Sequence, residues 1–266
     1  MDFDFELIAA PFRMQPGLRR LDPGTRHLTL LAPGSALFEE KRRVHEVGAA
    51  RHLAAGFDPG PALAAIAQQA ESESHPAFDA SRLELAFEED FAVLDGADGR
   101  LPWLCVCVPS HWAPEDKIGL DFAAVHAPVA DNTALLRTGS RLVELATSGE
   151  RWERFVWTVS PSPRHDQHPR RQPRAPWPSA DDDEGFIRGC WLRVERQTFF
   201  PVGRGTRQAV FTIRVQLQPL AQAVDSASKA VRLHAALASM SEAVLAYKGL
   251  SRARAPLLRW LARKSA

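Results

Sequence analysis

Histidine offers the clearest route to metal or acid–base chemistry in this chain, and one of its nine histidines stands apart. His126 lies in the apolar run AAVHAPV, where Pro128 restricts the backbone that follows it. A buried imidazole needs a partner for each ring nitrogen. On the residues alone, that partner is either a backbone carbonyl or a metal ion, and both alternatives stay open.

A second pair of histidines lies in a segment rich in proline and arginine. His165 and His168 flank Asp166 in RHDQHP, a spacing that a metal pair could use. The composition of residues 161–183 instead favours a long loop with solvated polar side chains. The motifs HExxH, GxSxG and GxxxxGK[ST] are absent from the sequence, and the glycines of Gly203–Gly205 fit a hairpin tip better than a nucleotide site.

The segment LRVERQTFF, Leu192–Phe200, is the second candidate for chemistry. Strand alternation predicts one face with Leu192, Val194, Arg196, Thr198 and Phe200, and an opposite face with Arg193, Glu195, Gln197 and Phe199. A buried Arg196 requires an anion or a complete hydrogen-bond network, because a guanidinium does not lose its proton. Glu195 and Gln197 form a polar row on the other face, for which a cross-strand ion pair in solvent is an equal alternative.

The three cysteines, Cys105, Cys107 and Cys190, are too few for a disulfide framework, an iron–sulfur cluster or a structural zinc site. Cys105 and Cys107 alternate with Val106 in an apolar run, which is typical of buried thiols that act as small hydrophobic residues. A reducing cytoplasm is therefore the expected location.

Composition excludes several classes of protein. The 266 residues carry a formal net charge of +1, with 45% hydrophobic and 24% charged residues, which is typical of a soluble globular protein. A nucleic-acid binder usually has a large basic excess, which is missing here. No run of 18 apolar residues predicts a membrane span, and the first residues do not resemble a signal peptide.

The elements that must position these residues alternate as hairpins rather than as strand–helix units. Turn residues predict hairpins over Asp90–Val108 and Gly189–Leu217, with a further strand at Arg154–Ser160. Apolar periodicity predicts four main helices, at 36–53, 60–70, 132–148 and 221–247, the last one ending at Gly249. The pattern indicates an α+β fold with an antiparallel sheet, in a single domain over residues 1–266.

Three segments carry a resemblance to a known family. They are LDPGTRHLTLLAPGSALFEEKRR (Leu21–Arg43), CVPSHWAPEDKIGLDFAAVHAPV (Cys107–Val129) and LRVERQTFFPVGRGTRQAVFTIRV (Leu192–Val215). Their order and spacing resemble the alpha subunit of the haem-dependent oxidative N-demethylases, also called dimethylamine monooxygenases. The resemblance extends from about Pro11 to Gly249. Val156 and Ala130 depart from the family pattern, which affects the assignment of fine substrate contacts.

The resemblance implies a PAS-like curved antiparallel sheet with flanking helices that binds haem b. It implies that haem iron activates O2 and that dimethylamine is hydroxylated next to its nitrogen, giving methylamine and formaldehyde. Electrons are expected from NAD(P)H through a separate reductase subunit that carries FMN and a two-iron two-sulfur cluster. The small number of cysteines in this chain agrees with that division of labour.

The resemblance also implies roles for individual residues. His126 is expected to be the axial ligand of the haem iron. Arg196 is expected in the haem pocket beside Gln197 and Thr198, with Arg214 on the partner strand as a cation for the propionates. Glu195 is expected to hold the substrate ammonium, and Trp157 to form a pocket wall.

Two other functions remain open on the sequence. PAS-type domains often serve as haem-binding sensors without turnover, and fold alone does not distinguish a sensor from an enzyme. A signalling coiled coil would favour the sensor, and the basic segment at the end of the chain lacks heptads. A scaffold that has lost haem is the third alternative.

Overall fold

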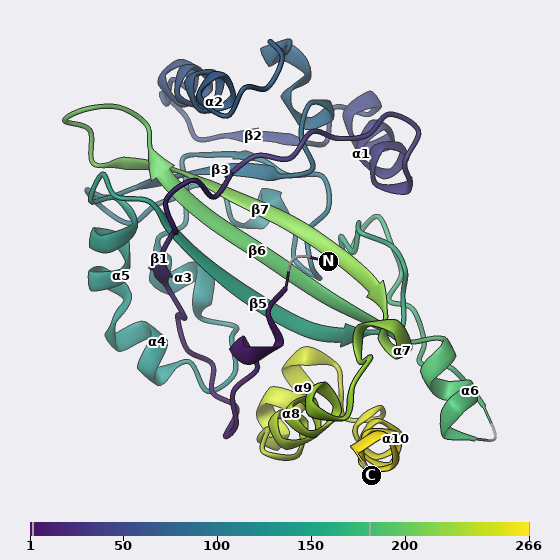
Figure 1. The fold of residues 1–266 in the computed structure, drawn as a ribbon. Helices are drawn as coiled ribbons and strands as arrows, with labels where there is room; N and C mark the ends of the chain where they lie inside the picture. The colour runs from purple at the N-terminus through teal and green to yellow at the C-terminus, as the bar shows by residue number, and fades with distance from the viewer. Residues whose placement is uncertain (2, 181, 266) are drawn as a thin grey trace.

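A seven-stranded antiparallel sheet forms the centre of the protein. The computed structural model describes residues 1, 3–180 and 182–265 (Figure 1). The strands lie in the order β1-β5-β6-β7-β3-β4-β2, and each pairs antiparallel with its neighbours. Their bounds are β1 Arg19–Arg20, β2 Arg51–Leu53, β3 Asp90–Asp95, β4 Trp103–Cys105, β5 Trp152–Ser160, β6 Trp191–Pro201 and β7 Gln208–Pro219. The expected α+β architecture with an antiparallel sheet is confirmed.

The long strands β5, β6 and β7 form the middle of this sheet. The β6–β7 hairpin is in register from Trp191 opposite Pro219 to Pro201 opposite Ala209, and Gly205 in its tip has a φ of +78°. A positive φ is accessible to glycine at little steric cost, which suits the tight reversal. The predicted hairpin and the predicted alternation of β6 are both confirmed.

Helices surround the sheet at both ends. The α-helices are α1 Ala36–Glu46, α2 Gly60–Ser72, α3 Phe122–His126, α4 Thr133–Arg137, α5 Gly139–Ala146, α6 Asp183–Arg188, α7 Leu220–Ala223, α8 Ala227–Ala238, α9 Glu242–Lys248 and α10 Arg254–Ser265. Short 3-10 helices occupy η1 Phe5–Leu7, η2 Ala80–Leu85 and η3 Pro114–Asp116. Among the described residues, no helix has the length and apolar character needed to cross a membrane.

Three predicted helices are shorter than expected. The helix predicted at 36–53 ends at Glu46, because the chain turns at Gly48 with a φ of +67° and 51–53 then pairs with β4. The helix predicted at 132–148 breaks at Thr138, whose hydroxyl donates to the Ala134 carbonyl. Such local hydrogen bonds compete with regular helix geometry.

The long C-terminal helix predicted at 221–247 consists of α7, α8 and α9. Ser226 and Ser241 each accept a hydrogen bond from a backbone N–H in the first turn of the helix that follows, so both act as N-caps. The predicted C-cap at Gly249 is confirmed, with a φ of +69°. Serine caps inside an apolar pattern therefore divide what periodicity alone presents as one helix.

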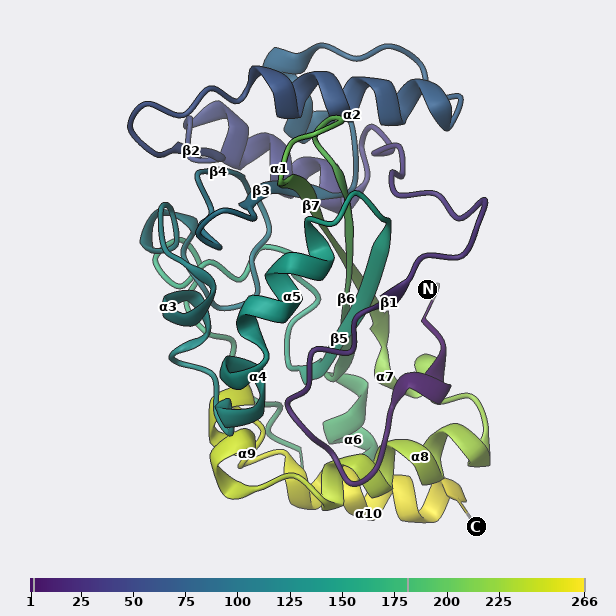
Figure 2. The same ribbon diagram turned by 90° about the vertical axis from the view of Figure 1, so that its left-hand side faces the viewer.

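The two faces of β5–β7 are covered by different parts of the chain. We call the side with Arg193, Glu195 and Gln197 the Glu195 face, and the side with Arg196 and Thr198 the Arg196 face. Helices α3 and α4 lie to one side of these strands, while the N-terminal segment with β1 lies to the other (Figure 2). Leu94, Val143, Phe199 and Ala209 form a buried cluster that anchors α5 to the Glu195 face.

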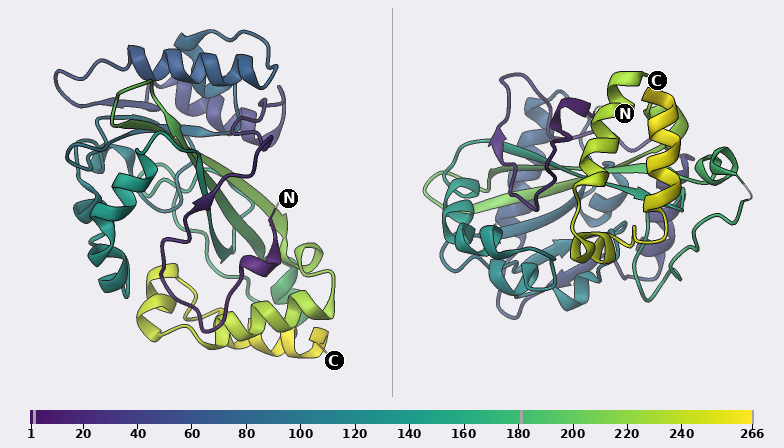
Figure 3. Two further views of the ribbon diagram at one scale, coloured as in Figure 1. Left: turned by 60° about the vertical axis from the view of Figure 1, so that its left-hand side comes forward. Right: turned by 90° about the horizontal axis from the view of Figure 1, so that it is seen from below.

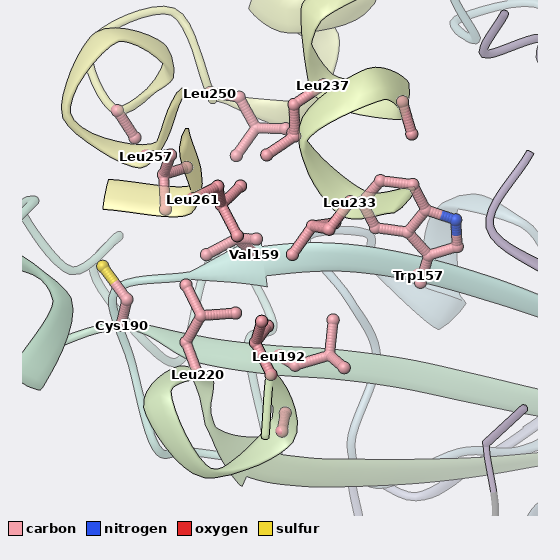
Figure 4. Packing of buried hydrophobic residues seen from close by; sticks show 14 of the residues in the cluster. Trp157, Val159, Cys190, Leu192, Leu220, Leu233, Leu237, Leu250, Leu257 and Leu261 are labelled. Atoms are coloured by element: carbon pink, nitrogen blue, oxygen red, sulfur yellow. The ribbon is translucent and has the colours of Figure 1, made fainter. Parts of the chain in front are cut away.

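The largest apolar core lies on the Arg196 face, at the C-terminal end of β5 and the N-terminal end of β6. Helices α8 and α10 run side by side there (Figure 3). Leu233 and Leu237 from α8 and Leu261 from α10 meet Leu192 and Val159 of the sheet (Figure 4). Fully burying such a side chain contributes roughly 1.5–3 kcal/mol, so this cluster fixes the C-terminal helices to β5 and β6.

The segment predicted as a solvated loop is packed instead. His168 is only 2% exposed, and its Nε2 lies 3.0 Å from Glu115 Oε2. The buried Asp166 carboxylate accepts from Arg171, while the Asp166 backbone N–H donates to Glu40 at 2.6 Å. The prediction of solvated side chains is therefore wrong for His168, because carboxylates and carbonyls distant in sequence satisfy this part of the loop.

A buried ion pair joins α1 to the start of β3. The side chains of Lys41 and Asp90 are 0% and 1% exposed, and Lys41 Nζ lies 3.0 Å from Asp90 Oδ1. Nζ also donates to the Phe87 and Glu89 carbonyls at 3.1 and 2.8 Å. Burial acts to lower the pKa of the Lys41 ammonium, but the facing Asp90 carboxylate outweighs it and the pKa is raised.

Removing this ammonium should destabilise the protein strongly. We expect Lys41→Met to lower the free energy of unfolding by about 3–5 kcal/mol, because Asp90 is left as a buried charge without its partner. Urea denaturation followed by circular dichroism measures the change. The matched control is Lys229→Met, which removes an exposed pair with Asp225 and should cost no more than about 1 kcal/mol. Equal effects of the two substitutions would contradict the assignment.

Candidate active site

The Glu195 face is incompletely covered in the middle of the sheet. Glu195 and Gln197 are half-buried, although β6 is a central strand with β5 on one side and β7 on the other. Val156, which pairs with Glu195, and Phe211, two positions before Ile213 on β7, are half-buried as well. Strands on both edges of β6 flank these side chains within the sheet. Their partial exposure therefore shows that the elements packed on this face do not cover it completely.

The Glu195 side chain accepts hydrogen bonds from two neutral groups. Its Oε2 accepts from Gln197 Nε2 at 2.8 Å, and its Oε1 accepts from the Ser110 hydroxyl. Arg193 Nε donates to the same Ser110 oxygen at 2.8 Å, while its other nitrogens donate to the carbonyls of residues 108, 164 and 165. Ser110 therefore stands between a buried guanidinium and the Glu195 carboxylate, and keeps them from forming a direct ion pair.

The charge of Glu195 reaches several basic groups. Burial lowers the pKa of Arg193 to about 10 and that of Lys248 to about 8, and in both cases the Glu195 carboxylate opposes the decrease. Burial likewise lowers the pKa of Arg154, again opposed by Glu195. These groups come from β5, β6 and α9, so Glu195 is the electrostatic centre of this face.

His126 ends the short helix α3 beside this face. Asp121 caps the helix by accepting from the Ala124 N–H at 2.8 Å. His126 Nδ1 lies 2.8 Å from the Phe122 carbonyl, and the His126 and Phe122 rings stack with centroids 4.1 Å apart. A carbonyl can only accept, so Nδ1 carries the proton and Nε2 keeps its lone pair.

The electrostatics of His126 keep its ring neutral. Burial lowers the pKa of the imidazole; the Phe122 carbonyl opposes this, and the positive charges of Arg154 and Lys117 add to the decrease. Within the described ranges, Nε2 has no hydrogen-bond partner. A neutral imidazole with one nitrogen fixed by a backbone carbonyl and the other available has the form of a metal ligand.

Arg154 is a site residue that the sequence did not single out. Its Nε is buried without a hydrogen-bond partner, and the residue lies on β5 opposite Gln197. Its charge acts on both His126 and, through Glu195, on the middle of the face. A buried guanidinium nitrogen without a partner favours an anion that the chain does not supply. The sequence offers one indication of this role: in the predicted strand, Arg154 lies on the face opposite to the aromatic residues Phe155 and Trp157.

Arg196 and Thr198 lie on the opposite face of the sheet. Arg196 Nε lies 3.1 Å from Glu153 Oε2, and its Nη1 donates to the Arg26 carbonyl at 2.9 Å. Thr198 Oγ1 lies 2.6 Å from Thr212 Oγ1 and 2.9 Å from Nδ1 of the fully buried His27. Both residues therefore belong to a polar network inside the Arg196 face, separated by the sheet from Glu195 and Gln197.

Trp157 and Arg214 also lie away from His126. Trp157 is 7% exposed and packs in the core with α8 and α10, where Phe12 meets it edge-on. Arg214 pairs across strands with Arg196, and its Nε lies 2.7 Å from Glu88 Oε2. Of the residues predicted from the sequence, the structure brings Glu195 and Gln197 together on the face beside which His126 lies, and places the other four elsewhere.

The thiols and carboxylates offer no alternative metal centre. Burial raises the pKa of Cys190 to about 12 and those of Cys105 and Cys107 well above the ordinary range, so all three remain thiols at neutral pH. Among residues 1, 3–180 and 182–265, no group of three or more His, Cys, Asp or Glu side chains could hold a metal ion. A single imidazole ligand is compatible with that finding.

A partly open sheet face lined by ionisable groups, with a neutral imidazole beside it, defines an α+β protein built to bind a ligand or cofactor. The model of one family, described as haem-dependent oxidative N-demethylase, alpha subunit-like, matches residues 70–258. The match includes more than half of the 266 residues, and the chain belongs to this family.

The residues beside this face fit a haem. His126 Nε2 offers a lone pair for iron, and the Phe122 carbonyl fixes the ring in the tautomer that axial ligation requires. Arg154 offers a buried, unpartnered Nε to a propionate. Val156 of β5 and Phe211 of β7 supply half-buried apolar surface on the same face of the sheet. The chemistry of these residues is therefore compatible with the group after which the family is named.

The electrostatic coupling of Arg154 to His126 can be measured without any cofactor. We expect the His126 imidazole to titrate below the ordinary histidine pKa, and Arg154→Gln to raise that pKa, because removing a nearby positive charge favours the imidazolium. Two-dimensional NMR of ring nitrogens records both values, with His126→Gln used for assignment. Arg204→Gln, an exposed change at the hairpin tip, is the control. An unchanged pKa of His126 in the Arg154→Gln variant would contradict the electrostatic coupling between the two residues.

Proposed function

We propose that this protein oxidatively N-demethylates a small secondary amine such as dimethylamine, on a PAS-like scaffold in the cytoplasm. The family supplies the reaction class, and one observation carries the assignment of the site. His126, fixed through Nδ1 with Nε2 available, lies beside a partly exposed sheet face that holds the Glu195 carboxylate, which forms no direct ion pair among the described residues. When bound, haem b supplies the activation of O2.

His126 is the proposed ligand of the iron. Its Nδ1–H bond to the Phe122 carbonyl orients the ring and increases the basicity of Nε2. The stacked Phe122 ring limits rotation, and Phe122 itself is seated by Gly139, where a β-carbon would lie 2.8 Å from the ring. This support fixes the direction in which the imidazole lone pair points.

Glu195 is the proposed acceptor for the substrate. A secondary amine is protonated at neutral pH, and its ammonium hydrogens need a carboxylate with oxygens free to accept them. Among the described residues Glu195 forms no direct ion pair, since its hydrogen bonds come from Ser110 and Gln197, although its charge also acts on Arg154, Arg193 and Lys248. The Gln197 amide fixes the carboxylate plane, so the ammonium binds in one orientation and one methyl group is presented to the oxidant. Glu195 then accepts or returns the nitrogen-bound proton.

The overall reaction balances with one external electron pair. Protonated dimethylamine, O2, NAD(P)H and one proton give methylammonium, formaldehyde, water and NAD(P)+. The C–H bond next to nitrogen becomes a C–OH bond, and the carbinolamine then breaks its C–N bond. A separate reductase subunit with FMN and a two-iron two-sulfur cluster is the proposed electron source, since such a cluster commonly takes four cysteine ligands and this chain has three cysteines.

The experiment combines a spectrum with turnover. The purified chain is loaded with haem, its Soret band is recorded, and formaldehyde is measured after addition of dimethylamine, O2 and a flavin–iron–sulfur reductase with NADPH. We expect His126→Ala to lose haem retention. His234→Ala, a half-buried histidine on α8, is the matched control and should keep it.

Glu195→Gln tests the substrate contact separately. Losing one charge-assisted hydrogen bond costs about 1.5–3 kcal/mol, so kcat/KM for the amine should decrease about tenfold to a hundredfold with a normal Soret band. Full haem retention in His126→Ala would exclude this residue as the ligand. A Soret band without formaldehyde, whatever the reductant, would favour a haem-binding sensor, and no Soret band at all would favour a scaffold.

A further inference from the structure

A second cavity lies at the far end of β5 and is lined by basic groups. It has a volume of about 320 Å³. It lies between the C-terminal end of β5, the loop after β5 (residues 161–182) and the turn after α9. Three of its lining side chains are cationic: Arg174, Lys248 and Arg252. A fourth, His111, has its pKa lowered to about 4 by burial and by the charges of Arg174 and Arg193, so its ring is neutral. None of the described residues that line it is acidic, although the chain contains 32 Asp and Glu residues.

Two of these cations lack partners within the chain. Over residues 1, 3–180 and 182–265, neither Arg174 nor Arg252 forms a hydrogen bond or an ion pair through its side chain. Arg170, which lies in the same loop as Arg174, is by contrast paired with Glu115 and Asp116. Neighbouring like charges repel one another, and a bound anion relieves that repulsion.

Packing rather than charge holds Arg174 at the cavity. Its guanidinium lies against Gly249, where a β-carbon would overlap it. Trp177 Nε1 donates to the Gly249 carbonyl at 3.0 Å, which fastens the loop to the end of α9. The exposed Arg174 side chain therefore approaches the backbone at the end of α9, which lines the same cavity.

The remaining walls add directed polar groups. Gln167 is 5% exposed, and its Oε1 is buried without a hydrogen-bond partner, while its Nε2 donates to Ser160 Oγ at 3.0 Å. A buried carbonyl oxygen without a donor favours a ligand that offers one. His111 has a φ of +60°, in the left-handed region that non-glycine residues adopt uncommonly, as Ser74 and Asp131 also do in this protein.

We infer that this cavity binds the oxyanion group, carboxylate or phosphate, of a small organic molecule. Arg174, Arg252 and Lys248 contact the anion, and Gln167 Oε1 accepts a hydrogen bond from a hydroxyl on the same molecule. A bidentate guanidinium matches the geometry of both oxyanions. The volume of the cavity admits a molecule of several heavy atoms, with Trp177 and Pro176 as apolar walls. The anion is either a free metabolite or a propionate of a bound tetrapyrrole.

Calorimetric titration of the haem-free full-length chain tests the site with two probes, citrate and inorganic phosphate. We expect saturable binding of at least one probe, weakened about tenfold or more in the Arg174→Gln/Arg252→Gln double variant. Two controls accompany the titration. Arg204→Gln should bind citrate with unchanged affinity, and the uncharged probe glycerol should show no saturable binding to the unsubstituted chain. Because both substituted arginines are exposed, the double variant should fold normally.

A second arm identifies the source of the anion. If haem loading abolishes citrate binding, the cavity takes a propionate; if citrate binds the haem-loaded chain equally well, the ligand is a separate small anion. Absence of saturable binding by either probe, or equal affinity in the double variant, would overturn the inference. This inference extends the proposed function only in its haem arm. The titration of the haem-free chain measures anion binding even if the chain binds no haem, so a failure of the proposed function can be told apart from a failure of this inference.

Discussion

Strand β6 carries a buried arginine on each of its faces, and much of the surrounding structure satisfies those two charges. Arg193 is 1% exposed and Arg196 is 8% exposed, yet neither can lose its proton at neutral pH. Arg193 recruits the carbonyls of the packed loop, and Arg196 recruits the N-terminal segment and Glu153 of β5. The chain is therefore drawn onto both sides of one strand by hydrogen bonds as well as by apolar contacts.

This arrangement explains how the sheet divides structure from chemistry. On the Arg196 face, His27 is fully buried and its pKa is lowered to about 3, first by burial and then by the charges of Arg151 and Arg196. That network is buried, and His27 Nε2 and Arg196 Nη2 have no hydrogen-bond partner within it among the described residues. On the Glu195 face, the polar groups remain half-buried, and His126 stands next to them on a short helix. The same alternation thus produces a closed network on one side and an accessible site on the other.

The sequence allowed the alternation of β6 and the hairpin with β7 to be predicted, because side chains of a strand alternate with a period of two regardless of context. It did not show which face stays open. Its residue type suits Arg196 to a pocket, but Glu153 and the carbonyl of Arg26, 170 positions away, accept from its Nε and Nη1, while its Nη2 is buried without a hydrogen-bond partner among the described residues. Arg154 was missed for the converse reason, since its lack of a partner is a property of three-dimensional packing.

The loop after β5 shows a related limit. Its proline, arginine and histidine content is typical of a solvated segment, and composition contains no information about the partners that bury it. Glu40 of α1 receives two backbone N–H groups from the loop, and Glu115 receives His168. These contacts span more than fifty positions in sequence. Family resemblance, by contrast, depended on short local motifs, and it identified the family correctly.

The hydroxyl of Ser110 has a consequence for how this face tolerates change. It receives a hydrogen from Arg193 and gives its own to Glu195, so it insulates a cation from an anion that alternation places two residues apart. A side chain without a hydroxyl at this position would bring the two charges into direct neutralisation or leave one of them stranded. A single small loop residue therefore determines whether the Glu195 face presents a separate cation and anion or a neutral pair.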